Sequence, residues 1–122
     1  MKISFWLYCS DLKISFDFYQ KVFNLENVTL NNNKTFFVPL DSHAELKIST
    51  LQKPCNEQNI EINEAPVNDL YDTFIKNNLS QSEEFDVANM PAGTFSGPWD
   101  FPGGIALFLK DPNNHCIIFT EW

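Results

Sequence analysis

Residues 105–119 read IALFLKDPNNHCIIF, two apolar runs of strand length on either side of a short polar turn. Pro112 restricts φ to about −65° at the second turn position, and Asp111 can accept a hydrogen bond from the backbone two residues further on. Asn113 and Asn114 tolerate the left-handed conformation that such a turn needs. The stretch therefore predicts a β-hairpin close to the end of the chain.

The composition indicates one folded domain and excludes several partners. The 122 residues include twelve Phe and three Trp, enough apolar material for a core of its own. Sixteen acidic and eight basic side chains leave a net charge of −8, a poor match to nucleic acid or an anionic membrane. Such a surface either attracts a cationic ligand or simply keeps the protein in solution.

The N-terminal sequence and the cysteine spacing bear on the cellular location of the protein. The chain starts directly in a strand pattern without a signal-peptide layout, and no apolar run approaches the roughly 20 residues that span a bilayer. Three cysteines without CxxC spacing, Cys9, Cys55 and Cys116, are expected to be reduced thiols. We therefore expect a cytoplasmic protein.

The first half of the chain alternates strand and helix signals. Residues 3–9 are rich in aromatic and β-branched side chains and predict a strand. Ser10 is a candidate helix N-cap with Asp11 in the first turn, and apolar residues then recur at helical spacing. They are Leu12, Phe16, Phe18, Tyr19, Val22 and Phe23. Three short strands are predicted after this helix, at 28–30, 35–40 and 45–50.

The second half repeats this order after a break at residues 53–56. Residues 60–63 predict a half-buried strand, and Pro66 marks the start of a helix that ends at Asn77 and Asn78. Its apolar residues, like those of the preceding strand, stand 55 positions after their counterparts in the first half. The matching pairs are Phe5 and Ile60, Leu7 and Ile62, Leu12 and Val67, Phe16 and Tyr71, and Tyr19 and Phe74.

The long segment 80–104 has no counterpart in the first half. Residues 86–90 are expected to form one strand, and residues 97–104 a Pro- and Gly-rich loop. The hairpin at 105–119 then completes a second βαβββ unit.

The chain resembles the vicinal-oxygen-chelate superfamily, which includes glyoxalase I, bleomycin-resistance proteins and extradiol dioxygenases. The resemblance rests on CSDL at 9–12, FYQKVFNL at 18–25, GGIALF at 103–108 and DPNN at 111–114. It implies an α+β fold in which paired βαβββ modules, at about 1–52 and 57–122, form an open cupped mixed sheet around a central cavity with helices outside. The dioxygenases mostly use four such modules, so that branch is disfavoured.

Alternation along the strands of this implied fold divides the side chains between two faces. Phe5 and Leu7 are expected under the first helix, and Leu46 and Ile48 in the core. The residues expected to face the cavity are Ser4, Trp6, Tyr8, Glu45, Lys47, Asn59, Glu61, Asn63 and Ile118.

The resemblance also implies where metal-using members would hold a divalent ion. The four ligand positions, usually His or Gln, Glu, His and Glu, fall on Ser4, Glu45, Asn59 and Ile118. One carboxylate, an amide, a hydroxyl and an aliphatic group do not hold a transition metal. His43 and His115 stand in predicted turns and are expected to face solvent. We therefore predict no metal site, no cofactor and no ordinary glyoxalase I activity.

Two functions remain open for the cavity. The first is binding of a small aromatic or cationic molecule by Ser4, Trp6, Tyr8, Asn59, Trp99, Phe101 and Ile118, as in bleomycin-resistance proteins. In that case Trp99 and Phe101 lie on a loop that either covers the cavity or packs against a second subunit. The alternative is a lyase or isomerase of the glyoxalase family in which Glu45 or Glu61 is the general base. A homodimer is expected in either case, and an accessory subunit without a ligand is a third possibility.

Overall fold

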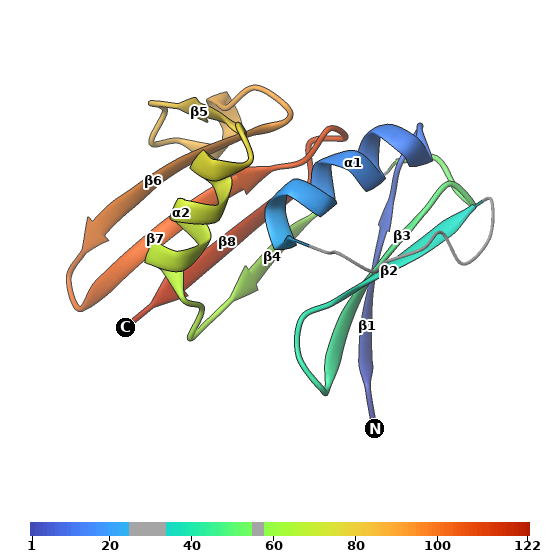
Figure 1. Ribbon diagram of the computed structural model, residues 1–122, viewed down its shortest axis with the longest axis horizontal. Coiled ribbons are helices and arrows are strands. Elements are labelled where there is room, and N and C mark those ends of the chain that lie inside the picture. Colours follow the sequence, from blue (N-terminus) through green and yellow to red (C-terminus); the bar gives the residue numbers. More distant parts are fainter. Residues whose placement is uncertain (25–33, 55–57) are drawn as a thin grey trace.

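The computed structural model describes residues 1–24, 34–54 and 58–122 and contains two halves built alike (Figure 1). The helical segments are α1 (Leu12–Phe23), α2 (Val67–Lys76) and the 3₁₀ turn η1 (Val87–Asn89). The strands are β1 (Ile3–Tyr8), β2 (Thr35–Pro39), β3 (Ala44–Ser49), β4 (Asn59–Ile62), β5 (Ser80–Ser82), β6 (Thr94–Phe101), β7 (Gly104–Lys110) and β8 (Cys116–Glu121). No helix in this part of the chain is long and apolar enough to span a membrane.

The described strands form two sheets with related connections. The first has the order β1-β3-β2 and the second the order β4-β8-β7-β6-β5. In each sheet the opening strand of the half pairs in parallel with its last strand, β1 with β3 and β4 with β8. The pairs β2–β3, β6–β7 and β7–β8 are antiparallel, and the short strand β5 is parallel to β6. The repeat predicted from the 55-residue displacement is therefore present in the topology. The strand predicted at 28–30 lies outside the described residues, as does part of the break at 53–56.

Helix α1 begins one residue later than its candidate cap suggested. Asp11, rather than Ser10, is the N-cap, and its carboxylate accepts a hydrogen bond from the backbone N–H of Ile14 at 3.1 Å. Tyr19 and Val22 are fully buried on the inner face of the helix. The helix ends at Asn24, whose φ of 51° is the left-handed conformation typical of a C-terminal cap.

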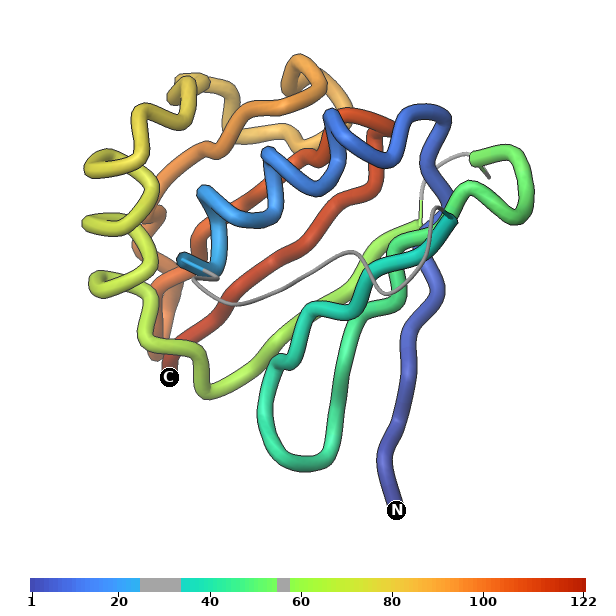
Figure 2. The backbone as a smooth tube through the Cα atoms, turned by 45° about the vertical axis from the view of Figure 1, so that its right-hand side comes forward, coloured from blue at the N-terminus to red at the C-terminus, as the bar shows by residue number. Residues whose placement is uncertain are grey.

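Both halves contribute to the larger of the two clusters of buried apolar residues, the main hydrophobic core. Tyr19 of α1 and Phe74 of α2, which are equivalent in the repeat, are both fully buried in it. The two helices lie next to each other in Figures 1 and 2, and the side-chain amide of Asn77 donates to the carbonyl of Lys21 at 2.8 Å. Leu46 and Ile48 are in the core as predicted.

Two predictions for the segment 80–104 are wrong. Residues 86–90 form no strand, because the Asp86 carboxylate accepts from the N–H of Ala88 at 3.0 Å and caps the turn η1. Residues 97–104 are no open loop, since β6 continues to Phe101 and the register shifts between Ser96 and Trp99. This bulge lets the strand pass Pro98, which has no N–H for the ladder.

The Asp-Pro-Asn-Asn turn between β7 and β8 joins the two halves. The buried carboxylate of Asp111 accepts hydrogen bonds from the N–H groups of Asn113 and His115 through Oδ1 and from the Tyr19 hydroxyl through Oδ2. The ring Nε2 of His115 lies 2.8 Å from the carbonyl oxygen of Tyr8, at the end of β1. The prediction that His115 faces solvent is therefore wrong. Only 1% of it is exposed, because the turn is packed against the first half. His43 is exposed as predicted.

Burial changes the ionisation of Asp111, in this turn, and of Tyr19, the residue of α1 that donates a hydrogen bond to it. Desolvation raises the pKa of Asp111 above its usual value, although the hydrogen bond from Tyr19 acts in the opposite direction. Desolvation and the neighbouring carboxylate raise the pKa of Tyr19 well above its usual value, so its hydroxyl remains a donor.

The Tyr19→Phe variant is expected to raise the pKa of Asp111 further. Removing the hydroxyl leaves desolvation in place and takes away a hydrogen bond that stabilises the ionised carboxylate. Carboxyl-carbon NMR titration of the wild type and the variant measures the change. A lower pKa of Asp111 in the variant would show that the hydrogen bond does not act as described. Tyr71→Phe, on the half-buried Tyr71 of α2, is the matched control.

Candidate functional site

The face of the first sheet that points away from the helices carries a row of aromatic and charged side chains. Trp6, Lys47 and Phe37 are direct neighbours across β1, β3 and β2. The ammonium group of Lys47 lies 5.0 Å from the centre of the Trp6 ring and 5.3 Å from that of Phe37. Tyr8 stacks beside Trp6 with ring centres 6.1 Å apart and planes inclined by 25°. The row is a flat aromatic platform with one cation on it.

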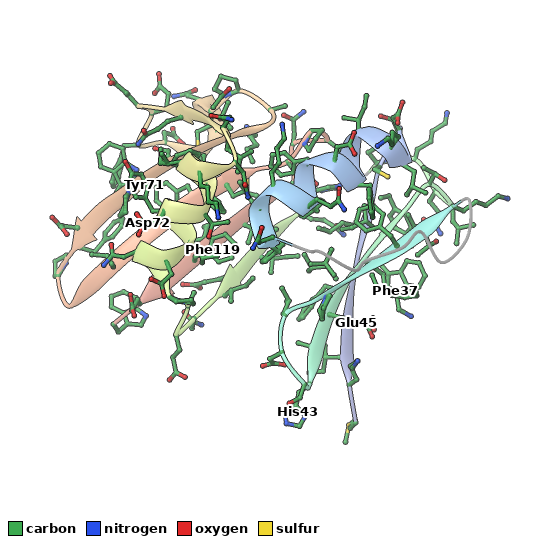
Figure 3. The ribbon with its side chains drawn as sticks, in the orientation of Figure 1. Phe37, His43, Glu45, Tyr71, Asp72 and Phe119 are labelled. Atoms are coloured by element: carbon green, nitrogen blue, oxygen red, sulfur yellow. The ribbon has the colours of Figure 1, made fainter. Side chains whose placement is uncertain are left out.

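The next row towards the start of β1 contains a carboxylate. Glu45 on β3 neighbours Ser4 on β1, and its side chain is 16% exposed. Its Oε1 lies 3.9 Å from the ammonium of Lys2. Figure 3 shows Glu45 and Phe37 on the strands of the first sheet. The carboxylate therefore stands beside the aromatic platform with a cation of its own nearby.

A shallow pocket of about 490 Å³ lies where β1 comes close to the start of β4. It brings together four of the predicted site residues, Ser4, Trp6, Tyr8 and Asn59, with Gln58 beside them. The side-chain Oε1 of Gln58 is buried and accepts no hydrogen bond from any residue that the structure describes. A buried acceptor without a donor is costly, so this oxygen is a candidate partner for a ligand or a water molecule.

The other predicted site residues belong to the second sheet. Glu61 on β4 pairs in register with Ile118 on β8, and Glu61 is exposed. Trp99 and Phe101 lie on β6 in an aromatic cluster with Phe85, whose ring centre is 5.3 Å and 5.7 Å from theirs. Neither of these aromatic residues lines the pocket beside Trp6.

The indole N–H of Trp99 already has a partner. It donates to the hydroxyl of Ser96 at 2.9 Å, and that hydroxyl donates to the backbone carbonyl of Glu84 at 2.6 Å. Ser96 is fully buried. Ser96 therefore connects the segment before η1 to β6, and the indole N–H of Trp99 is already used in this arrangement.

The four positions implied for a metal do not fit a transition metal. Asn59 pairs in register with Cys116 rather than with Ile118, and Glu45 has Lys2 close to its carboxylate. Among the described residues no three His, Cys, Asp or Glu side chains are grouped so that they could hold an ion. Cys9 and Cys116 are buried, and desolvation raises the pKa of the Cys9 thiol. The donor set offers a carboxylate, an amide and a hydroxyl, a poor combination for such a metal.

Sequence reasoning missed two residues of this site. Phe37 could have been assigned to it by alternation, because Phe36 and Val38 on either side of it are both fully buried. Gln58 carries no comparable signal, since it precedes β4 and its position depends on how the two halves pack. Phe5 was expected under α1 but is 40% exposed, while Leu7 is buried as predicted.

Comparison with known proteins gives matches in structure alone. No protein-family model and no curated protein sequence matches the chain. A glyoxalase/bleomycin resistance protein from Catenulispora acidiphila matches with a TM-score of 0.69 and 12% sequence identity, over 100% of this chain and 98% of that one. A bleomycin resistance determinant encoded on transposon Tn5 has a TM-score of 0.68 and 9% identity, over 99% of this chain and 97% of that one.

A third structure comes from a ligand complex. The bleomycin-binding protein of Streptomyces verticillus, crystallised with copper(II)-bleomycin, has a TM-score of 0.67 and 15% identity, over 100% of this chain and 96% of that one. Agreement over the whole length of each chain, at identities this low, is agreement in fold. The chain therefore has the α+β fold of the glyoxalase/bleomycin-resistance proteins, the vicinal-oxygen-chelate fold.

Proposed function

We propose that this protein binds a small planar aromatic molecule against the outer face of its first sheet, with Trp6 as the stacking surface. The observation that carries the proposal is the exposed Trp6 ring, stacked on Tyr8 and bordered by the pocket that Ser4, Gln58 and Asn59 line. Aromatic walls with a few polar groups at one end are typical of small-molecule sites. The bleomycin-binding neighbours support small-molecule binding on this fold.

The charge on the platform favours one class of aromatic ligand. Lys47 already occupies the position over the Trp6 ring that a cationic ligand would take. A planar molecule with a carboxylate can stack on the aromatic rings and place its charge beside Lys47. Of the two classes expected from the sequence, aromatic and cationic, this face therefore favours an aromatic ligand that carries negative charge.

Three acridines that share one ring system test this proposal. Acridine-9-carboxylate is expected to raise the melting temperature more than acridine, and 9-aminoacridine least of all. Trp6→Ala is expected to weaken binding of the carboxylate about fivefold in calorimetric titration, because one stacking contact is worth roughly 1 kcal/mol. Bleomycin, tested in the same assay, covers the cationic alternative.

Two control variants show whether binding is confined to this face. Phe85→Ala removes another exposed aromatic ring, in the cluster of the second sheet, and is expected to leave the affinity unchanged. Trp99→Ala combined with Phe101→Ala tests the ligand role that the sequence suggested for these residues. Loss of binding in these variants with full binding in Trp6→Ala would move the site to the second sheet.

The alternative function is carboxylate-based catalysis. Glu45 is mostly buried beside Ser4 on the same face as Trp6, and this observation favours it over the exposed Glu61 as a general base. In a metal-free lyase or isomerase of this family, Glu45→Gln would abolish turnover of a candidate substrate, and Glu61→Gln would leave most of it. Turnover that survives Glu45→Gln would exclude this assignment.

The homodimer and the cytoplasmic location remain predictions of this proposal. The open aromatic face and the edge of β1 leave Ile3 and Trp6 exposed, surface that a second copy of the chain could cover. Analytical ultracentrifugation with and without acridine-9-carboxylate measures the association. The net charge of −8 continues to argue against nucleic acid as a partner.

A further inference from the structure

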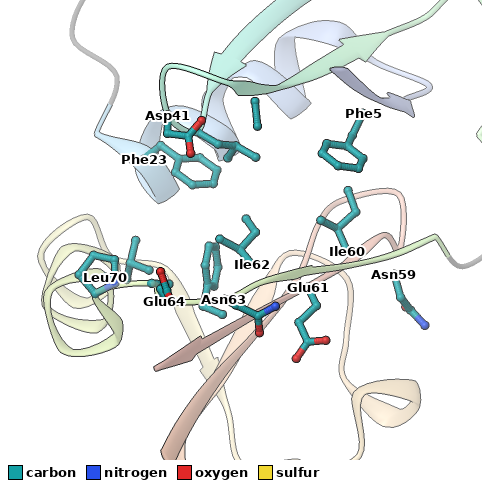
Figure 4. Close-up of a pocket in the computed structure, with 15 residues that line it drawn as sticks. Phe5, Phe23, Asp41, Asn59, Ile60, Glu61, Ile62, Asn63, Glu64 and Leu70 are labelled. Carbon is teal, nitrogen blue, oxygen red and sulfur yellow. The ribbon is translucent and has the colours of Figure 1, made fainter. Parts of the chain in front are cut away.

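A second cavity, larger than the pocket beside Trp6, lies between the two halves on their helical side. Its volume is about 640 Å³, and its walls come from the C-terminal end of α1, the start of α2, β1, β4 and the turn between β2 and β3. Figure 4 shows Phe5, Phe23, Ile60 and Ile62 directed into this space. We call it the inter-half cleft.

The inter-half cleft adjoins the pocket beside Trp6, since Phe5, Asn59 and Ile60 line both, but the residues that carry the two proposals differ. Alternation along β1 places Phe5 on the side opposite to Ser4 and Trp6. Glu61 and Asn63 of β4 line the cleft as well. Trp6 does not line the cleft, and Asp41 and Glu64 do not line the pocket beside Trp6, so these residues can be changed separately.

The inside of the cleft is apolar. Phe23, Ile62 and Leu70 line it and also pack against the hydrophobic core, and Phe5, which lines it too, is 40% exposed. An exposed apolar surface of this kind, recessed between two halves, is favourable for burying an alkyl or aryl group.

The polar boundary of the cleft is acidic. Asp41, in the turn between β2 and β3, and Glu64, after β4, are exposed residues that line the cleft. Neither carboxylate forms an ion pair with another residue of the described ranges 1–24, 34–54 and 58–122. One oxygen of Asp41 accepts from the N–H of His43. Two acidic groups without a cation beside an apolar hollow complement a molecule with an apolar body and a cationic head.

We propose that the inter-half cleft binds an amphiphilic cation, with the apolar part between Phe5 and Ile62 and the positive head beside Asp41 and Glu64. The aromatic platform does not offer this combination, because Lys47 supplies its cation from within the protein. The ligand class proposed for the cleft therefore differs from the class proposed for the site at Trp6.

Decyltrimethylammonium and decanoate, both below their micellar concentrations, are matched probes for the cleft. Calorimetric titration of the full chain is expected to detect the cation and to find decanoate at least tenfold weaker. Asp41→Asn combined with Glu64→Gln is expected to weaken binding of the cation about tenfold, since it removes both carboxylates beside the cationic head. The control Asp72→Asn with Glu83→Gln removes the same charge outside the cleft and is expected to leave the affinity unchanged.

Two further variants test whether the probe occupies the cleft and whether the cleft binds it without the aromatic site. Ala44→Phe narrows the cleft and is expected to weaken both probes, with circular dichroism confirming that the variant is folded. Trp6→Ala is expected to leave decyltrimethylammonium binding unchanged, so failure of the aromatic site and failure of the cleft are distinguishable. No binding of the cation, equal binding of decanoate, or equal losses in the two charge variants would overturn the proposal.

Discussion

Replacing Asp111 with alanine is expected to lower the free energy of unfolding by about 2–4 kcal/mol, measured by urea denaturation. The side chain is 2% exposed and accepts three hydrogen bonds, from Tyr19, Asn113 and His115. Alanine leaves these donors without an acceptor in a region from which water is excluded. The turn and the contact of His115 with the end of β1 are expected to loosen together.

The pH dependence of this loss has a definite sign. Because burial raises the pKa of Asp111 in the folded protein, the folded state binds a proton more tightly than the unfolded chain. The stability that this group contributes is complete below its unfolded pKa and declines as pH rises through the folded pKa. The loss caused by Asp111→Ala is therefore expected to be larger at pH 4 than at pH 7. Asp72→Ala, on the exposed side of α2, is the control and should change stability by less than about 0.5 kcal/mol.

Replacing Phe74 with alanine is expected to cost about 3–5 kcal/mol of unfolding free energy. Phe74 is fully buried, and its ring centre lies 5.2 Å from that of Phe95 and 6.3 Å from that of Phe119. The variant creates a cavity under α2 and removes two aromatic contacts between that helix and its sheet. Urea denaturation with a fitted slope separates this loss from a change in the unfolded state.

The next residue along α2 is the natural control. Ile75 is 46% exposed, so Ile75→Ala leaves no cavity and is expected to cost less than about 1 kcal/mol. Similar losses at the two positions would mean that α2 does not present Phe74 to the core as described. In that case the equivalence of Phe74 and Tyr19 in the two halves would also be lost.

Local patterns in the sequence were sufficient for the architecture. The 55-residue displacement between Tyr19 and Phe74 predicted two halves with the same order of elements, and the topology of the two sheets has that order. Helical spacing and strand alternation report which face of each element is apolar, so they identify the core without knowledge of its neighbours. The turn at Asp111 was predicted in the same way, from residue types that favour it.

Predictions from local patterns were wrong for residues whose contacts come from segments far away in the sequence. Residues 97–104 look like a loop because of their Pro and Gly content, but pairing with β7 and a bulge keep them in a strand. The expectation for His115 was wrong because a turn residue is normally exposed, and nothing close to it in sequence indicates that Tyr8 is its partner.

The sequence by itself determined the two α/β halves and the apolar faces of their helices, whereas the metal positions at Ser4, Asn59 and Ile118 followed only from the family resemblance. Only the tertiary structure decided that Lys47 lies over the ring of Trp6 and that a cleft remains between the halves. The physical reason is the range of the interactions. Periodicity and turn preference act over a few residues, whereas a platform or a cleft depends on how surfaces far apart in the chain pack against each other.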